Sequence, residues 1–160
     1  MSVIDTPVLE STKTAFVDVW KMPPAPGHKP VLLSISDNPD DHSDLHRIVD
    51  SEIWEIRTAN TCRGGLRKLA KKVDVVIAES SLPDGTWKDI LRRVSTLEKP
   101  PQLIVASRLA DASLWAEVLN LGGYDVLAKP LRSEEVGHVL ENIVREHMRG
   151  GLRVRTAGTM

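Results

Sequence analysis

Short apolar runs alternate with longer amphipathic segments along most of the chain from residue 31 onward. The short runs have the length of strands and occupy residues 31–35, 53–59, 74–79, 102–106 and 126–128. Apolar residues on one helical face predict helices at residues 40–50, 61–72, 111–121 and 133–149, with a further helix that Thr86 caps. This alternation predicts one parallel sheet with helices on both faces.

We therefore predict a flavodoxin-like α/β fold, a three-layer sandwich whose five-stranded parallel sheet has the strand order 2-1-3-4-5. In this topology a ligand site lies at the carboxyl ends of strands one and three. The second strand carries charges at intervals, which is typical of an edge strand. The helix after it contains a Gly-Gly pair at residues 64–65, so we expect that helix to be poorly formed.

The two ends of the chain differ in composition from this regular region. Residues 22–30 contain four prolines and a glycine, so we expect residues 1–29 to be a poorly ordered arm or linker. Residues 30–148 then form the folded domain, and residues 149–160 form an arginine-rich tail. A length of 160 residues suits one domain.

Charge and composition narrow the functional classes. The net charge of −1 supplies no strong field for nucleic acid or for an anionic membrane, and no apolar run approaches a membrane span. The single cysteine, Cys62, excludes an intramolecular disulfide and fits a reducing cytosol, so we expect a cytoplasmic protein. The sequence contains no Walker loop, nucleophile elbow or Ser-His-Asp pattern, and we therefore expect no enzyme and no catalytic residues.

Three charged side chains follow strands whose carboxyl ends the predicted topology brings together. Asp37 follows the first strand, Glu79 ends the third, and Lys129 follows the fifth. Two carboxylates can hold Mg²⁺ through oxygen ligands, and a lysine can bind a phosphoryl oxygen as a point charge. The alternative is that all three are solvated charges at the ends of loops.

Three segments carry a resemblance to a known family: SDNP (residues 36–39), DVVIAESSLPDG (residues 74–85) and GGYDVLAKP (residues 122–130). Over residues 29–147 the chain resembles a response-regulator receiver domain of the CheY-like type. The resemblance implies an aspartate at the end of strand three that accepts a phosphoryl group from a histidine kinase, and an acid pair after strand one that binds Mg²⁺. It also implies a Ser or Thr ending strand four, an aromatic residue in strand five, and a lysine followed by a cis proline.

The chain departs from this pattern at most of the functional positions. The phosphoacceptor position falls on Glu79, and the acid pair falls on Ser36 and Asp37, so one acid is missing. Only Asp37 and Lys129 are as the family has them. Glu79 has two possible roles: a permanent mimic of the phosphorylated state, or a plain salt bridge that neutralises Lys129.

The positions that signal phosphorylation in the family are also changed. The switch Ser or Thr falls on Ala106, which cannot donate a hydrogen bond, and the switch aromatic falls on Val126. A shifted register would place Ser107 at the first of these positions. Trp115, on the fourth predicted helix, is either a core residue or a contact for a partner, since aromatic residues are enriched at interface hot spots.

The sequence thus predicts a stand-alone, degenerate receiver (a pseudo-receiver) that works in bacterial two-component signal transduction by phosphorylation-independent protein–protein interaction. The partner would be a histidine kinase, another signalling protein or a second copy in a homodimer. We expect no cofactor, or at most weak Mg²⁺ binding at Asp37 and Glu79. The alternatives are a phosphorylation-competent receiver that uses Mg²⁺, and a module that binds a small anion or nucleotide.

Overall fold

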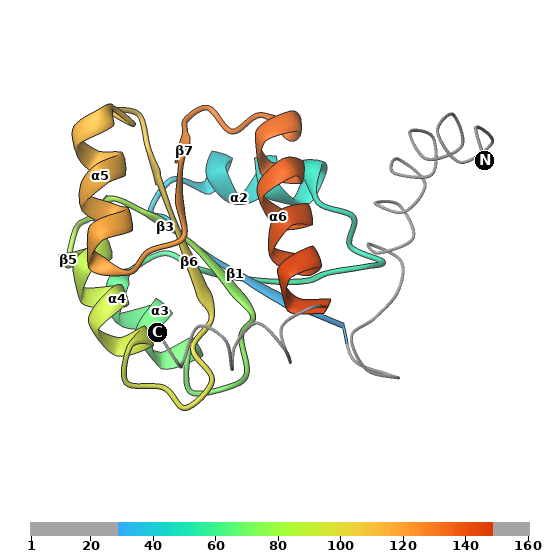
Figure 1. The fold of residues 1–160 in the computed structure, drawn as a ribbon, viewed down its shortest axis with the longest axis horizontal. Helices are drawn as coiled ribbons and strands as arrows, with labels where there is room; N and C mark the ends of the chain where they lie inside the picture. Colours follow the sequence, from blue (N-terminus) through green and yellow to red (C-terminus); the bar gives the residue numbers. More distant parts are fainter. Residues whose placement is uncertain (1–28, 149–160) are drawn as a thin grey trace, which may run out of the picture.

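The structure, a computed structural model, describes residues 29–148, and side chains are described as far as Glu146. The predicted arm and tail therefore lie almost entirely outside the described residues. Within the described part the chain forms a central sheet with helices against both faces (Figure 1).

The sheet has five parallel strands, and its three inner strands are almost wholly buried. Its strands are β1 (Val31–Ile35), β2 (Glu55–Ala59), β3 (Val75–Glu79), β6 (Gln102–Ser107) and β7 (Asp125–Ala128). Their spatial order is β2-β1-β3-β6-β7, with every neighbouring pair parallel. Because β6 and β7 are the fourth and fifth strands of this sheet, the predicted order 2-1-3-4-5 is confirmed.

Two apolar clusters hold the helices against the sheet. On one face lie α2 (Pro39–Ile48) and α6 (Ser133–Met148). On the other face lie α3 (Cys62–Lys68), α4 (Trp87–Val94) and α5 (Ala112–Leu121). The alternating side chains of β1 and β3 contribute to both clusters, as expected for a sheet that is buried on both sides.

The local signals in the sequence fix several helix ends. Thr86 and Asp89 form a capping box at the start of α4, in which the Thr86 N–H donates to Asp89 Oδ2 at 3.0 Å. Gly122 ends α5 with a φ of 111°, a left-handed conformation that favours glycine.

Two features differ from the prediction. Strands β4 (Ser81–Leu82) and β5 (Gly85–Thr86) form a small antiparallel hairpin after β3 that the sequence did not predict. The glycine-containing helix α3 is well formed but ends at Lys68, four residues early. A Cβ on Gly65 would lie 2.4 Å from Ile35 Cδ1, so this glycine allows α3 to approach β1 closely.

Candidate functional site at the carboxyl edge of the sheet

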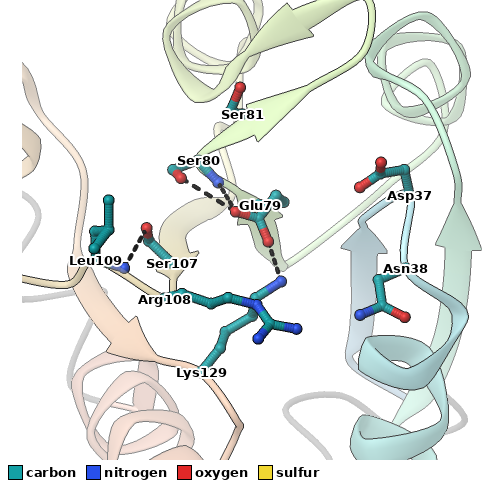
Figure 2. Close-up of a pocket in the computed structure, with 9 residues that line it drawn as sticks. All are labelled: Asp37, Asn38, Glu79, Ser80, Ser81, Ser107, Arg108, Leu109 and Lys129. Carbon is teal, nitrogen blue, oxygen red and sulfur yellow. Dashed lines mark hydrogen bonds and ion pairs between the residues drawn. The ribbon is translucent and has the colours of Figure 1, made fainter.

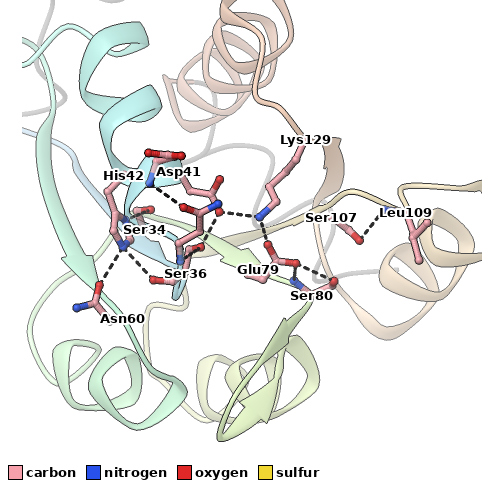
Figure 3. A network of polar contacts seen from close by, with 12 residues as sticks. Ser34, Ser36, Asp41, His42, Asn60, Glu79, Ser80, Ser107, Leu109 and Lys129 are labelled. Carbon is pink, nitrogen blue, oxygen red and sulfur yellow. Dashed lines mark hydrogen bonds and ion pairs between the residues drawn. The ribbon is translucent and has the colours of Figure 1, made fainter.

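Lys129 is the centre of a buried ion-pair network at the carboxyl edge of the sheet (Figure 3). It follows β7, where its backbone N–H donates to Ser107 O at 3.1 Å, and its peptide bond to Pro130 is cis, as the resemblance implied. Its Nζ donates to Asp41 Oδ2 at 2.6 Å and also to Glu79 Oε1. One ammonium group therefore joins α2, β3 and the end of β7.

The three charged side chains of this network are largely removed from solvent. Their exposed fractions are 7% for Lys129, 12% for Asp41 and 14% for Glu79. Burial alone would lower the pKa of the Lys129 amine, but the hydrogen bonds and charges of Asp41 and Glu79 outweigh burial and raise it above its usual 10.5. Lys129 is therefore a fixed cation at neutral pH.

Asp41 reaches the site from the first turn of α2. Asn38 caps this helix by accepting from the Asp40 N–H at 2.9 Å. Ser36, directly after β1, donates from Oγ to Asp41 Oδ2 at 2.6 Å and accepts from the Asn38 N–H at 3.1 Å. The hydroxyl of Ser36 thus orients the carboxylate of Asp41 toward Lys129.

Both oxygens of Glu79 are engaged. Oε1 accepts from Lys129, and Oε2 accepts from the backbone N–H and from the Oγ of Ser80, each at 3.1 Å. Ser80 is itself fixed, since its N–H also lies 2.9 Å from Ala106 O. The carboxylate is thereby held at the tip of β3 by donors on two sides.

A second polar chain extends from Ser36 beneath α2. His42 Nδ1 lies 2.8 Å from the hydroxyl of Ser34, a 2%-exposed residue in β1. His42 Nε2 faces two oxygens, Ser36 O at 3.0 Å and Asn60 Oδ1 at 3.2 Å. Because both of these oxygens are acceptors, Nε2 carries a proton. His42 is therefore a half-buried structural link, and its i,i+4 spacing from His46 forms no metal site here.

An open pocket of about 450 Å³ lies above the network (Figure 2). Lys129 and Glu79 are at its floor, and the Arg108 side chain extends across it. Asp37 lines the pocket from the β1–α2 loop but is exposed and lies apart from Lys129, which contacts Asp41 instead. The structure therefore brings Glu79, Lys129 and Ser36 together as expected, whereas Asp41 stands where Asp37 was expected.

Of the remaining sequence-predicted residues, Ser107 lines the pocket, whereas Ala106, Val126 and Trp115 do not. Ala106 is paired with Glu79 across the β3–β6 ladder, and Val126 is half-buried in β7. Ser107 is buried, and its Oγ accepts from the Leu109 N–H at 3.1 Å. Trp115 is 50% exposed on α5, which excludes a purely core role for this side chain.

The carboxylates do not fit a Mg²⁺ site. Within residues 29–148, no group of three or more His, Cys, Asp or Glu side chains is arranged to hold a metal ion. The two buried carboxylates, Asp41 and Glu79, already share the Lys129 ammonium group. A divalent ion prefers several oxygen ligands in regular geometry, and here it would have to displace a buried, fully charged lysine.

Sequence reasoning missed Asp41. An acid in the first turn of a helix is sufficiently explained by the helix dipole, so Asp41 carried no distinct signal. The available signal was the pairing of a short polar residue at Ser36 with an acid in the next helical turn. In α-helices side chains lean toward the N-terminus, which directs such an acid toward the strand tips.

A doubly wound five-stranded sheet with carboxylates and a lysine at its carboxyl edge defines the CheY-like class of α/β domains. The response regulator receiver domain family matches residues 32–141, more than half of the chain. The chain therefore belongs to the response regulator receiver domain family and is a receiver domain of two-component signalling.

Solved structures with low sequence identity share this fold. The signal receiver domain of a Vibrio parahaemolyticus protein described as a LuxO repressor is 20% identical, with a TM-score of 0.72 over 78% of this chain and 97% of that one. A CheY-like receiver from Methanospirillum hungatei is 18% identical, with a TM-score of 0.69 over 77% and 99%. The CheX–CheY–BeF₃–Mg complex of Borrelia burgdorferi gives 21% identity and a TM-score of 0.65 over 71% and 88%.

A search of curated proteins found no match. In residues 29–148, none of the helices combines the length and apolar character needed to cross a bilayer.

Proposed function

We propose that this receiver domain is a pseudo-receiver, which acts through protein–protein contact without accepting a phosphoryl group. The observation that carries the proposal is the state of Glu79, whose two carboxylate oxygens are bound by Lys129 and by Ser80. A nucleophilic carboxylate must present a free oxygen to the phosphoryl donor. Here an attack would first have to break hydrogen bonds to a buried ammonium group.

The length of the Glu79 side chain also opposes phosphoryl transfer. Glutamate has one methylene more than the aspartate that the family uses, which displaces its carboxylate by roughly 1.5 Å. Misplacement of a reacting atom by about 1 Å can slow a reaction by about 10²-fold. The readout would also be lost, because Ala106 has no hydroxyl and Val126 has no ring. We therefore expect no autophosphotransfer activity.

The proposal includes independence from Mg²⁺. Lys129 supplies the positive charge between Asp41 and Glu79, and Asp37 stands apart as a single exposed carboxylate. A lone exposed carboxylate gives at most weak binding of a hard divalent cation.

Docking is proposed for the surface formed by α5, β7 and α6. Trp115 is 50% exposed and Leu121 is 51% exposed on α5, and large apolar side chains at such exposure are typical of contact surfaces. The CheY of the Borrelia burgdorferi complex binds another protein, CheX. By analogy the partner here is a histidine kinase, another signalling protein or a second copy.

Beryllofluoride with Mg²⁺ tests the central claim. The chain is titrated with both and followed by fluorine NMR, with the CheY of the Borrelia burgdorferi complex as positive control because its structure contains BeF₃ and Mg. We expect no bound fluoride resonance for this chain. The variant Glu79→Asp is the matched control for the extra methylene. A stoichiometric adduct on the unmodified chain would instead support a phosphorylation-competent receiver.

A second experiment separates the two roles of Glu79. We favour a structural ion pair with Lys129, because mimicry needs a downstream switch that Ala106 and Val126 do not supply. Glu79→Gln should then shift backbone amide resonances only around Asp41, Ser80 and Lys129. Shifts that extend over α5 and β7 in the folded variant would favour the mimic.

A further inference from the structure

Charge is strongly segregated in the first half of the domain. Residues 37–55 contain seven Asp or Glu side chains and one arginine. Residues 57–72 contain six Lys or Arg side chains and neither Asp nor Glu. The net charge of −1 for the whole chain therefore conceals two consecutive segments of opposite sign.

The fold carries these segments to opposite faces of the sheet (Figure 1). Helix α2 packs Leu45 and Val49 into the apolar cluster that it shares with α6. Helix α3 packs Cys62 and Leu69 into the cluster on the other face, which it shares with α4. The charged side chains of each helix are left on the outside, so α2 presents mainly acidic side chains on one side of the sheet and α3 presents basic side chains on the other.

Much of this charge has no counter-ion in the described part of the chain. We define the acidic surface by the exposed residues of α2 and the turn after it, Asp40, Asp50 and Glu52. We define the basic surface by the exposed residues of α3 and the turn after it, Arg67, Lys68 and Lys71. Within residues 29–148 none of these six side chains forms an ion pair, although neighbours such as Arg47 with Asp44 and Arg57 with Glu55 do. Both surfaces are thus available to outside charges.

Helix dipoles do not account for the whole pattern. They favour acids at the start of α2, where Asp40 lies, and cations at the end of α3, where Arg67 and Lys68 lie. Asp50 and Glu52, however, follow the C-terminal end of α2, where the dipole disfavours negative charge. The acidic surface therefore extends beyond what local helix stability requires.

We propose that the basic surface of one molecule docks onto the acidic surface of a second copy of this chain. The complementarity is present within a single sequence, and each surface offers the charge that the other lacks. Because the two surfaces are different, the contact is heterologous and can repeat from copy to copy as an open chain. A polyanion such as duplex DNA is disfavoured, since the opposite face would repel it. The contact is separate from the α5–β7–α6 surface and does not depend on the proposed function.

Ionic strength gives the first test, with sedimentation velocity on the full chain as the measurement. The screening length is about 30 Å at 10 mM salt and about 3 Å at 1 M. We expect the weight-average mass to rise with protein concentration at 10 mM NaCl and to equal that of the monomer at 1 M. A monomer at every concentration in low salt, or association that salt does not weaken, would overturn the proposal.

Two neutralised variants give the second test. One carries Arg67→Gln, Lys68→Gln and Lys71→Gln, and the other carries Asp40→Asn, Asp50→Asn and Glu52→Gln. Each alone should stay monomeric, while an equimolar mixture should form a 1:1 complex through the two unmodified surfaces. Formation of the 1:1 complex on mixing also shows that both variants are folded. A mixture that stays monomeric while both variants keep the wild-type circular dichroism would refute the pairing.

Lys99→Gln is the matched control, because it removes an exposed positive charge that lies outside both charged surfaces. This variant should associate like the wild type. Loss of association in Lys99→Gln would show that the contact is not confined to the two charged surfaces and would overturn the proposal. Duplex DNA is added to the self-associated protein at 10 mM NaCl as a further check. If the DNA binds the basic surface and dissociates the assembly, the partner of that surface is a polyanion and the proposal is overturned.

Discussion

Replacing Lys129 with methionine removes the ammonium group that Asp41 and Glu79 share. Methionine keeps an unbranched side chain of similar length, so the change is mainly the loss of charge. The side chains of Lys129, Asp41 and Glu79 are at most 14% exposed, so solvent screens their two ion pairs only weakly. Removing one partner of a buried ion pair costs about 3–5 kcal/mol, a large part of the roughly 5–15 kcal/mol that stabilises a typical domain.

Without Lys129, the carboxylates of Asp41 and Glu79 lose the ammonium group that they share, and this loss is the source of the expected deficit. In the wild type the raised pKa of Lys129 gives stability that is fully present below pH 10.5 and is lost only above it.

Urea unfolding followed by tryptophan fluorescence measures this effect. Trp54 and Trp87 are 1% and 4% exposed, so both report the loss of the core. Lys99→Met is the control for removing an exposed lysine, with an expected change within about 0.5 kcal/mol. A Lys129→Met deficit below about 1 kcal/mol at pH 7 would refute the assigned role of the network.

Three smaller predictions follow from single side chains. Gly65→Ala should destabilise the domain by about 1–3 kcal/mol in urea unfolding, because its Cβ would overlap Ile35; an unchanged midpoint would contradict this close contact. Tyr124 is the only tyrosine, and burial together with the charge of Glu146 raises its pKa to about 12. Its near-ultraviolet titration should lie well above pH 10, with stability falling as pH rises from 10 toward 12. Burial raises the pKa of the Cys62 thiol, so the native chain should react with a disulfide reagent far more slowly than the urea-unfolded chain.

The order of the sheet was predictable because each strand and helix has its own hydrophobic period, and the alternation admits few topologies. The hairpin of β4 and β5 was not, since strands of two residues have no detectable period. Its turn is held by a distant contact, in which Asp84 accepts from the backbone N–H groups of Cys62 and Arg63 at 2.7 and 3.0 Å. The Gly64–Gly65 pair predicts a weak helix from local propensity alone, whereas Gly65 serves the packing of α3 on β1.

The site was predictable only where it depends on strand ends. Glu79 and Lys129 end or follow strands whose neighbours were known from the topology, and their ion pair is present. Asp41 projects from a helix, and its direction depends on how α2 lies over β1. That placement is a tertiary property, set by Leu45 and Val49 in the core.

The missing acid at position 36 and the carboxylate of Asp41 belong to one arrangement, because the Ser36 side chain hydrogen-bonds Asp41. The Ser36 hydroxyl donates to Asp41 Oδ2 at 2.6 Å, and this carboxylate oxygen also accepts from Lys129 Nζ at 2.6 Å. A carboxylate at position 36 would instead face Asp41 with like charge and repel it. The acid that the family places after the first strand is thus supplied one helical turn later. Lys129 therefore keeps two carboxylate partners although position 36 carries no acid.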